Sequence, residues 1–254
     1  MNENINFKFT PELYDKQINW ENRFKTEKDF FYSIFIGKNV KRVLDVGCGT
    51  ARHAQLFSSF VDEVYAMDPS EDMIEFARKE VVKSENIVLL KGGFKDLGKL
   101  NLGKFDAITC LGNTLPLLGN RKNVKSALKN TKKKLKKNGF AVFQFLNFEK
   151  KMIEKNRYYK PKILLHNDKK YIFHKHFEYG KVKTKTDFII TVLNKRDEIE
   201  VFNVESSIMC TLKIRIFEKM AINSGFKKIY YYGNDGKSIF NKNKHISLFA
   251  ILYT

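Results

Sequence analysis

Short apolar runs alternate with amphipathic segments through the first 150 residues, and this alternation constrains the fold more than any other feature. Strands that alternate with helices predict βαβ units, in which the strands run parallel and the helices cover the sheet. Two helix starts are readable between the strands, because Ser70 and Asn120 are good capping residues that each precede a helical pattern. The predicted strands are 42–46, 63–67, 86–90, 105–111 and 140–146.

The pattern changes from about Asn156 onward. Four apolar segments follow one another with only short turns between them, at 162–165, 171–179, 183–192 and 198–204. Neighbouring strands joined by short turns pair antiparallel. A helix at 213–223 then ends at Gly225, and two further strands are predicted at 226–232 and 245–252. We therefore predict that the second half contains an inserted antiparallel unit, and that the strands after it belong to the first sheet.

Composition excludes some classes of protein and leaves others open. Hydrophobic residues make up 43% of the 254 residues, which is ample for a folded core. Three cysteines without paired spacing indicate neither a disulfide framework nor a zinc site, and we expect no metal. With no apolar stretch of membrane-spanning length and no apolar leader, the sequence predicts a cytoplasmic protein without a membrane partner.

The formal net charge of +19 raises the question of nucleic acid binding. Of the 47 basic residues only 8 are arginines, whereas bidentate recognition of phosphates and bases favours arginine. We therefore interpret the excess of lysines as a solvated surface, with a nucleic-acid surface as the less favoured reading.

The segment 43–50 is an apolar strand that runs into a Gly-x-Gly turn and then a helix. Gly47 and Gly49 permit positive φ angles and close approach of a ligand to the backbone. A second strand leads to Asp68, about twenty residues later, where a carboxylate can accept both hydroxyls of a ribose. A dinucleotide is disfavoured because Arg52 stands where a third glycine would be, and because Asp45 would repel a pyrophosphate. The remaining alternative for Asp68 is a capping role before the next helix.

Five segments in order resemble the successive motifs of class I S-adenosylmethionine-dependent methyltransferases, across roughly residues 40–147. They are 43–50, 67–70, 91–97, 105–108 and 135–140. The resemblance implies a Rossmann-like α/β fold with a seven-stranded, mostly parallel sheet, helices on both faces, and a small antiparallel β insertion after the fifth strand. It implies one domain over 1–254, with an N-terminal helical lid at 1–40, a cofactor-binding core at 41–150, the insertion over the acceptor pocket at 156–210, and the end of the core sheet at 211–254.

The resemblance also assigns roles to individual positions. Gly47 and Gly49 would pass under the cofactor, Asp45 would face its amino end, and Asp68 would hold the ribose. Phe94 would lie against adenine, and Leu111 would offer its backbone to the amino acid part. Many members carry an acidic residue where Gly93 stands here, so backbone groups or Asp96 would have to bind the adenine amino group. The complete set of predicted cofactor-binding residues is Trp20, Arg23, Asp45, Gly47, Gly49, Asp68, Pro69, Met73, Phe94 and Leu111.

Within the family, segments 110–114 and 145–148 resemble glycine and sarcosine N-methyltransferases, which favours a small-molecule acceptor and an amine nitrogen. Tyr14, Trp20 and Arg23 would close over the cofactor. Those enzymes hold the substrate carboxylate with an arginine before the helix that ends here at Gly225, yet 206–210 contains none. We therefore do not predict glycine as the acceptor, and expect a different one that is larger or stacks on aromatic rings.

Four polar residues are candidates for the lining of the acceptor pocket: Asn113, Asn147, Tyr158 and Tyr159. A neutral amine needs only a polar site that orients its lone pair and receives its proton. Each candidate has a structural alternative, since Asn113 could cap a loop, Asn147 could start a helix, and the tyrosines could simply pack.

Two other functions stay open. One is an RNA methyltransferase that uses the lysine-rich surface, and the other is a cofactor-binding fold that serves only as an interaction protein. The chain is expected to act as a monomer or a homodimer.

Overall fold

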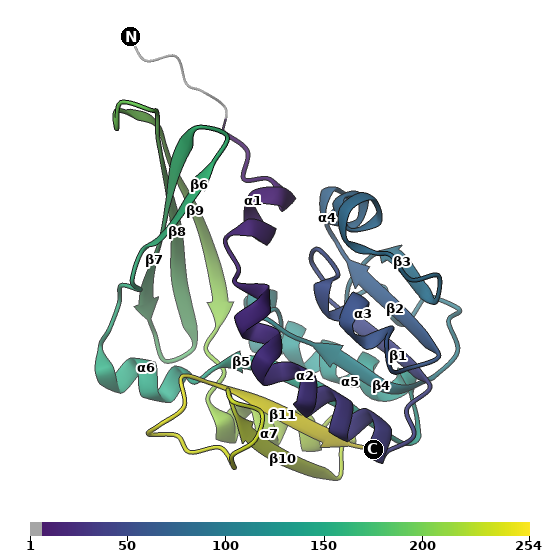
Figure 1. Ribbon diagram of the computed structural model, residues 1–254. Helices are drawn as coiled ribbons and strands as arrows, with labels where there is room; N and C mark the ends of the chain where they lie inside the picture. Colours follow the sequence, from purple (N-terminus) through teal and green to yellow (C-terminus); the bar gives the residue numbers. More distant parts are fainter. Residues whose placement is uncertain (1–6) are drawn as a thin grey trace.

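A seven-stranded sheet, the main sheet, forms the centre of the fold in the computed structural model, which describes residues 7–254 (Figure 1). Its strands lie in the order β10-β11-β5-β4-β1-β2-β3. Six of them run in the same direction, and β11 runs in the opposite direction between β10 and β5. The predicted mostly parallel α/β fold is therefore confirmed. The strands are β1 (Arg42–Val46), β2 (Glu63–Asp68), β3 (Ile87–Lys91), β4 (Phe105–Cys110), β5 (Leu135–Leu146), β10 (Lys228–Gly233) and β11 (Ser247–Tyr253).

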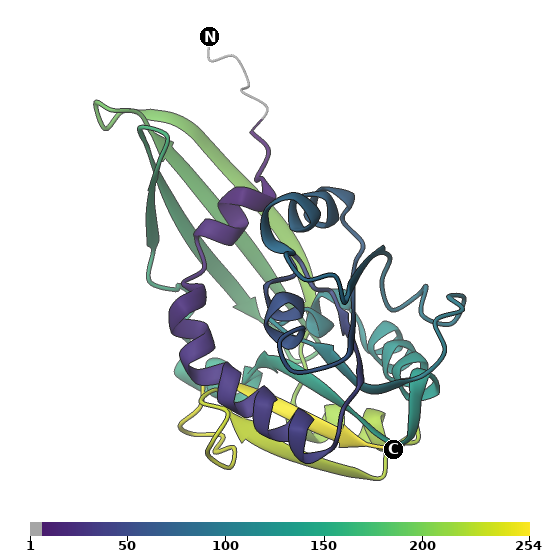
Figure 2. The same ribbon diagram turned by 45° about the vertical axis from the view of Figure 1, so that its right-hand side comes forward.

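Helices cover both faces of the main sheet (Figure 2). One face packs against α2 (Trp20–Gly37), α3 (Arg52–Phe57) and the helical turn that continues α4 (Glu71–Phe76). The other face packs against α5 (Arg121–Lys134) and α7 (Ile214–Ile222). Ser70 and Asn120 cap α4 and α5 through their side chains, as the sequence predicts.

A second, four-stranded antiparallel sheet follows β5 and the short helix α6 (Phe148–Glu154). Its strands are β6 (Lys162–His166), β7 (Lys169–Tyr179), β8 (Lys183–Leu193) and β9 (Ile199–Cys210). The predicted insertion after the fifth strand is therefore confirmed. Its last strand was expected to end at residue 204 but runs to Cys210, because it remains paired with β8 as far as Lys183.

The helix α1 (Pro11–Lys16) runs between α4 and the second sheet, as both ribbon views show (Figures 1 and 2). Just before α1, Lys8 forms an ion pair with Asp72 of α4. At its other end, Lys16 Nζ lies 3.1 Å from the His166 ring at the end of β6. The N-terminal segment thus bridges the two sheets above the carboxyl ends of the parallel strands.

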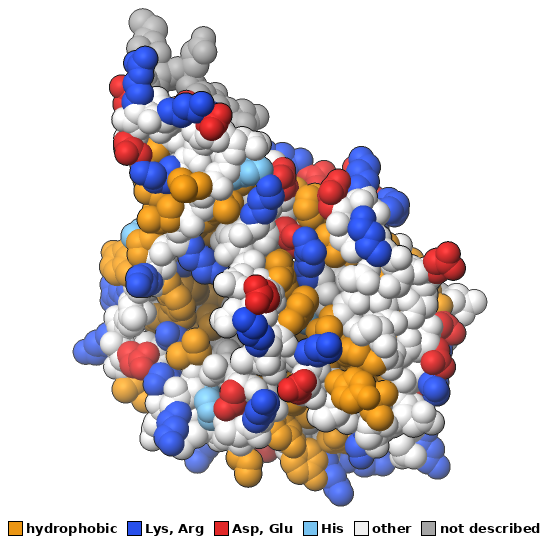
Figure 3. All heavy atoms as spheres, in the orientation of Figure 1, with side chains coloured by type: hydrophobic (Ala, Val, Ile, Leu, Met, Phe, Trp, Pro, Cys, Tyr) orange, Lys and Arg blue, Asp and Glu red, His pale blue; other side chains and the backbone are white. Residues whose placement is uncertain are grey.

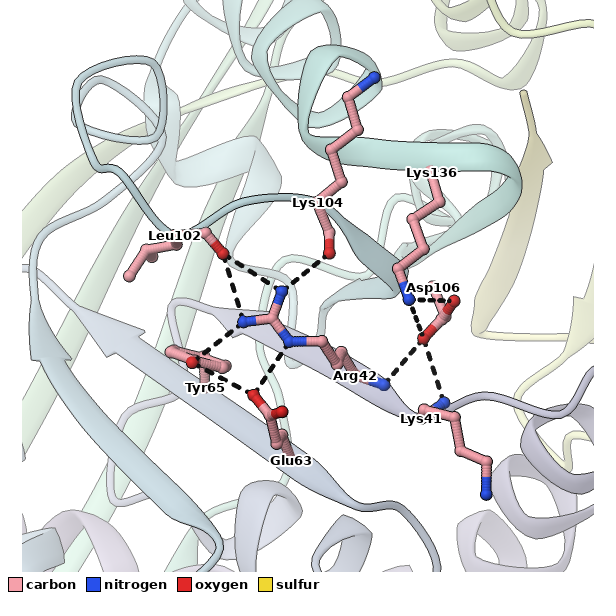
Figure 4. A network of polar contacts seen from close by, with 8 residues as sticks. All are labelled: Lys41, Arg42, Glu63, Tyr65, Leu102, Lys104, Asp106 and Lys136. Atoms are coloured by element: carbon pink, nitrogen blue, oxygen red, sulfur yellow. Dashed lines mark hydrogen bonds and ion pairs between the residues drawn. The ribbon is translucent and has the colours of Figure 1, made fainter.

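The opposite edge of the main sheet is closed by a polar network around Arg42 at the start of β1 (Figure 4). Its guanidinium donates to the Glu63 carboxylate at 2.9 Å and to the Tyr65 hydroxyl at 3.0 Å. It also donates to the carbonyls of Leu102 and Lys104 in the loop that enters β4. This network joins the amino-terminal ends of the strands, so it stabilises the sheet on the side away from the glycine turn.

None of the helices in residues 7–254 is long and apolar enough to cross a membrane.

The anchoring of α2 on the main sheet gives a prediction for stability. Phe31 is fully buried and its ring packs edge-on against Phe57 of α3 and Phe249 of β11. We expect Phe31→Ala to lower the free energy of unfolding by about 3–5 kcal/mol, because it removes a large buried ring and leaves a cavity. Chemical denaturation measures this. The neighbouring Tyr32, 51% exposed, supplies the control, since Tyr32→Ala should cost less than about 1 kcal/mol. Equal losses in the two variants would contradict the packing described for α2.

Candidate active site

The turn after β1 has a backbone shape that requires glycine. Gly47 has a φ angle of +75°, and a Cβ atom there would lie only 2.3 Å from Thr114 Cγ2. Gly49 has a φ angle of +56°. The amides of Gly47 and Cys48 donate to the Met67 carbonyl at 2.7 and 3.1 Å, which ties the turn to the end of β2. The turn therefore lies at the carboxyl edge of the parallel strands, where open α/β sheets bind their ligands.

Asp68 stands beside this turn at the end of β2. One carboxylate oxygen accepts from the Gly49 amide and the other from the Ser70 amide, both at 2.9 Å. A carboxylate has about four acceptor positions, so each oxygen keeps one for a further donor. Burial raises the pKa of this half-buried carboxyl, and the two amides oppose that rise. The residue that caps α4 is Ser70, so the free acceptor positions of Asp68 are not used for helix capping.

Asp45 lies deeper than Asp68. It is 1% exposed and accepts a hydrogen bond of 2.6 Å from Thr109 Oγ1 on the neighbouring strand β4. Burial raises its pKa, and the positive charge of His53 acts in the opposite direction. With so little accessible surface, Asp45 would act on a ligand through its charge or an intervening group.

Arg23 belongs to a buried polar network centred on Glu27, one helical turn along α2. Glu27 accepts from Arg23 Nε at 3.0 Å, lies 2.6 Å from His53 Nε2, and accepts from Gln144 Nε2 at 2.9 Å. Gln144 on β5 in turn accepts from Arg23 Nη2 at 2.8 Å and from the Gly112 amide at 2.9 Å. Sequence reasoning missed Glu27 and Gln144, because nothing in their local pattern separates them from other polar residues of a helix and a strand.

The first helix is attached directly to the glycine turn. Asp15 accepts from the Thr50 hydroxyl at 2.7 Å and forms a bidentate pair with Arg52. The Tyr14 ring would touch a Cβ atom placed on Gly49, at 3.5 Å. Burial raises the pKa of Tyr14, while the nearby charge of Arg23 lowers it. Trp20 donates to the Asp15 carbonyl at 3.2 Å and lies under the Arg23 guanidinium, 5.2 Å from ring centroid to Cζ. Tyr14 thus lies over the turn, while Trp20 and Arg23 pack on each other on α2. Asp15 contacts the residues that follow the turn and is not among the predicted site residues.

The remaining predicted cofactor residues surround the turn less directly. Pro69 and Met73 lie at the start of α4, where the Met73 amide donates to Ser70. The Phe94 ring is 6% exposed and belongs to the main core, so it leaves little surface for an adenine ring. The Leu111 carbonyl accepts from both the amide and the hydroxyl of Thr114, so it is already occupied.

Gly93 lies in open space, since a Cβ atom there would meet no other atom within 4 Å. Its amide donates to the Asp96 carboxylate at 2.9 Å. Asp96 is therefore committed in part to the loop in which Gly93 lies. The position at which many family members carry an acidic side chain is free here to accept one.

The four candidates for the acceptor pocket separate into two groups. Asn113, in a left-handed conformation, accepts from the Leu146 amide at 3.1 Å and approaches Met209 Sδ at 3.3 Å. The Tyr159 ring packs on Phe177, and its buried hydroxyl has no hydrogen-bond partner in the described part of the chain. These two side chains stay candidates.

The other two candidates, Asn147 and Tyr158, lie in positions that their structural alternatives explain. Asn147 caps α6 by accepting from the Lys150 amide, and it donates to the carbonyls of Lys242 and His245, so every polar atom of its side chain is used. Of the two roles that the sequence leaves open for Asn147, the start of a helix is the one observed. Tyr158 is 63% exposed and stacks on His176, which points to the other face of the second sheet from Phe177. Successive residues of a strand point to opposite faces, so Tyr158 lies away from Tyr159.

The Glu27 network predicts a pH dependence of stability. Burial alone would raise the pKa of Glu27, but hydrogen bonds from His53 and Gln144 and the charges of His53 and Arg23 outweigh it and lower the pKa to about 2. A carboxylate whose pKa is lower in the folded state stabilises the fold above its unfolded pKa, and this contribution is lost as pH falls toward 2. Glu27→Gln should therefore lower the free energy of unfolding by about 3 kcal/mol at pH 7.

Denaturation at several pH values measures this effect, and the gap between Glu27→Gln and the parent should narrow between about pH 5 and pH 2. Glu21→Gln is the matched control, because Glu21 lies on the same helix and pairs with Lys25 at the surface. A gap of constant size across this range would show that ionised Glu27 is not the stabilising species.

Comparison with known proteins agrees with this geometry. A methyltransferase domain family matches residues 43–139. The glycine/sarcosine N-methyltransferase of Parasynechococcus marenigrum is 29% identical over 142 residues, and that of Halorhodospira halochloris is 28% identical over 139. These alignments cover 55% and 54% of this chain and 50% and 52% of the relatives, so the chain spans about half the length of the curated relatives it matches.

Solved structures share the whole fold. An amino pentose methyltransferase from Micromonospora echinaspora, solved with S-adenosylmethionine bound, superposes over 100% of both chains with a TM-score of 0.74 at 18% identity. An S-adenosylmethionine-dependent methyltransferase from Clostridium acetobutylicum gives a TM-score of 0.74 at 17% identity over 95% of this chain and 96% of its own. At such identities the likeness concerns the fold. Taken with the domain match and the glycine turn next to Asp68, these findings confirm the resemblance seen in the sequence to class I S-adenosylmethionine-dependent methyltransferases.

Proposed function

We propose that this protein is an S-adenosylmethionine-dependent methyltransferase that transfers a methyl group by in-line displacement to a small-molecule acceptor, at an amine nitrogen. One observation carries the proposal: the Asp68 carboxylate, held by the Gly49 and Ser70 amides, retains two acceptor positions at the carboxyl edge of the parallel sheet. Two neighbouring hydroxyls of a ribose match this arrangement.

The residues around the turn fit the methyl donor. Gly47 and Gly49 would let the backbone pass beneath it, Asp68 would hold its ribose, and the buried charge of Asp45 would favour its ammonium end. The donor supplies a methyl group already activated on a sulfonium. The protein therefore has to align the acceptor, and alignment can contribute about 7–11 kcal/mol to lowering the barrier.

The acceptor side is formed by three segments in this proposal. The part of the predicted N-terminal lid that the structure describes, residues 7–40, and the second sheet within 156–210 would enclose the acceptor, and the loop after β4 would present Asn113 to it. A neutral amine attacks without a strong base, so the Asn113 amide would orient the nitrogen, and the unpartnered Tyr159 hydroxyl would be available as a proton relay. The N-methyltransferases among the relatives support an amine nitrogen.

The donor site is tested by removing its central carboxylate. Asp68→Ala should weaken the binding of S-adenosylmethionine and S-adenosylhomocysteine by at least about 1.5 kcal/mol, more than tenfold in the dissociation constant, because two hydrogen bonds to a charged group are lost. Calorimetry measures this. Asp62→Ala removes an exposed carboxylate that pairs with Lys41, and it should bind as the parent does. Unchanged affinity in Asp68→Ala would remove this residue from the site.

Transfer itself is tested with a labelled methyl donor and a panel of amines, with RNA as a separate arm. Label in a small amine supports the proposal. Label in RNA would instead select a nucleic-acid acceptor, and binding without transfer to either class would favour an interaction protein.

Gly93 allows a test that improves binding. Gly93→Asp should fold normally, because the added side chain enters open space and the φ angle of Gly93 lies outside the left-handed region that favours glycine. Its carboxylate would accept from the adenine amino group, so the affinity for S-adenosylmethionine should rise about tenfold. Gly98→Asp places the same charge in equally open space in the same loop and should have little effect. No gain at position 93 would mean that the adenine does not reach this loop.

A further inference from the structure

The second sheet has two faces of different character, and the one carrying Phe173 and Phe188 is called here the inner face. Phe9 packs edge-on against both rings, at 5.8 and 5.0 Å between centroids, so this face turns toward the N-terminal segment. Figure 3 shows a hollow between the second sheet and the N-terminal helices, with hydrophobic side chains on its walls. In the proposed function, this hollow receives the acceptor.

Two lysines lie on the inner face by strand register. Lys162 of β6 is paired with Phe173 of β7, and Lys175 of β7 is paired with Phe188 of β8. Since paired residues point to the same face of a sheet, both lysines point where Phe173 and Phe188 point. Lys175 Nζ lies 5.4 Å from the centroid of the Phe188 ring, and Lys162 Nζ donates to the Gln17 carbonyl at 3.3 Å. Lys162 therefore lies between the second sheet and the link from α1 to α2, and Lys175 lies on the same face of the sheet beside Phe188.

Neither lysine has an acidic partner in the described part of the chain. Within residues 7–254, no carboxylate oxygen lies within 4.0 Å of either Nζ atom. The acidic side chain that shares the inner face, Glu205, stands opposite Phe188 and contacts Asn203. Burial lowers the pKa of Lys175, and the charge of Lys162 lowers it further. Burial likewise lowers the pKa of Lys162, and there the charge of Arg23 adds to the effect. Both side chains are nevertheless exposed, so the two cations line the open surface of the hollow, where their charges create a positive potential that favours an anion.

The inner face also reaches the donor site. Met209 of β9 is paired with Thr184 of β8, which is paired with Tyr179 of β7, so all three form one row of this face. Asn113, in the loop after β4, touches Met209. Lys175 is four residues from Tyr179 along β7, which corresponds to about 13 Å. The cations thus lie at one end of the hollow, and the loop beside the glycine turn lies at the other.

We infer that Lys162 and Lys175 form an anion-binding subsite in the acceptor pocket, and that the acceptor of the proposed methyl transfer carries an acidic group, a carboxylate or a phosphate, remote from its nucleophilic atom. The two ammonium groups hold the acidic group as point charges, without the planar geometry that an arginine would impose. The apolar walls between the two ends enclose the body of the acceptor. An acceptor that spans this distance is longer than glycine.

The subsite is tested by calorimetric titration of inorganic phosphate, and separately of acetate, into the full chain saturated with S-adenosylhomocysteine. The variants are Lys162→Met and Lys175→Met, because methionine keeps most of the apolar stem and removes the charge. Lys183→Met is the matched control: Lys183 lies on β8, is exposed, and points to the other face of the same sheet. We expect saturable binding of at least one anion, weakened about tenfold by each inner-face substitution and unchanged by the control. A preference for phosphate or acetate identifies the acidic group.

Absence of saturable anion binding to the parent protein, or equal binding by the parent and both inner-face variants, would overturn the inference. The affinity for S-adenosylhomocysteine is measured in the same experiments and should not change in any of the lysine variants. If the lysine substitutions weaken that affinity instead, the cations belong to the donor site and the inference fails. If S-adenosylhomocysteine does not bind the parent at all, the proposed function fails, and titration of the anions into the protein alone still decides whether the lysines form a subsite.

Discussion

Glu27 carries a negative charge into the protein interior, and polar side chains from three different elements converge on it. Arg23 comes from the same helix, His53 from the helix after the glycine turn, and Gln144 from β5. A buried carboxylate is tolerated only when such partners surround it, so the three elements must keep one relative placement. Gln144 extends this constraint to the Gly112 amide in the loop after β4. The walls of the site are therefore positioned by one ionised group that need not touch a ligand itself.

The N-terminal segment is held in a second way. Asp15 binds Thr50 and Arg52, which immediately follow the glycine turn, while Lys8 and Lys16 reach α4 and the second sheet at the protein surface. The buried contact and the surface contacts differ in strength, since exposed ion pairs contribute about 0–1 kcal/mol. The N-terminal segment is thus held next to the turn by a buried polar contact, and toward the second sheet by surface contacts and by the packing of Phe9 on Phe173 and Phe188.

The sequence predicts features whose cause is local. The strands of the main sheet, the caps Ser70 and Asn120, and the Gly47 turn all follow from period, capping chemistry and backbone freedom within a few residues. Glu27, Gln144 and Asp15 have no such signal, because their roles come from partners 26, 117 and 35 residues away. Asn147 shows the opposite case. A resemblance favours a role at the acceptor, whereas the hydrogen bonds of its side chain are satisfied by a helix start and two carbonyls.

The high net charge has two different origins once the fold is known. Most lysines of α5 lie on its outer surface, and several in the second sheet pair with nearby carboxylates, as Lys169 does with Glu200. Such side chains are solvated, and their number says little about function. Lys162 and Lys175 differ because their surroundings lower their pKa values and their register turns them inward. Both keep exposed side chains on the face of the second sheet that turns toward the N-terminal segment, where an anion can reach them. The net charge by itself therefore leaves both nucleic acid and small anions open as partners, and the position of these two lysines among 39 is the ground for proposing a small anionic acceptor.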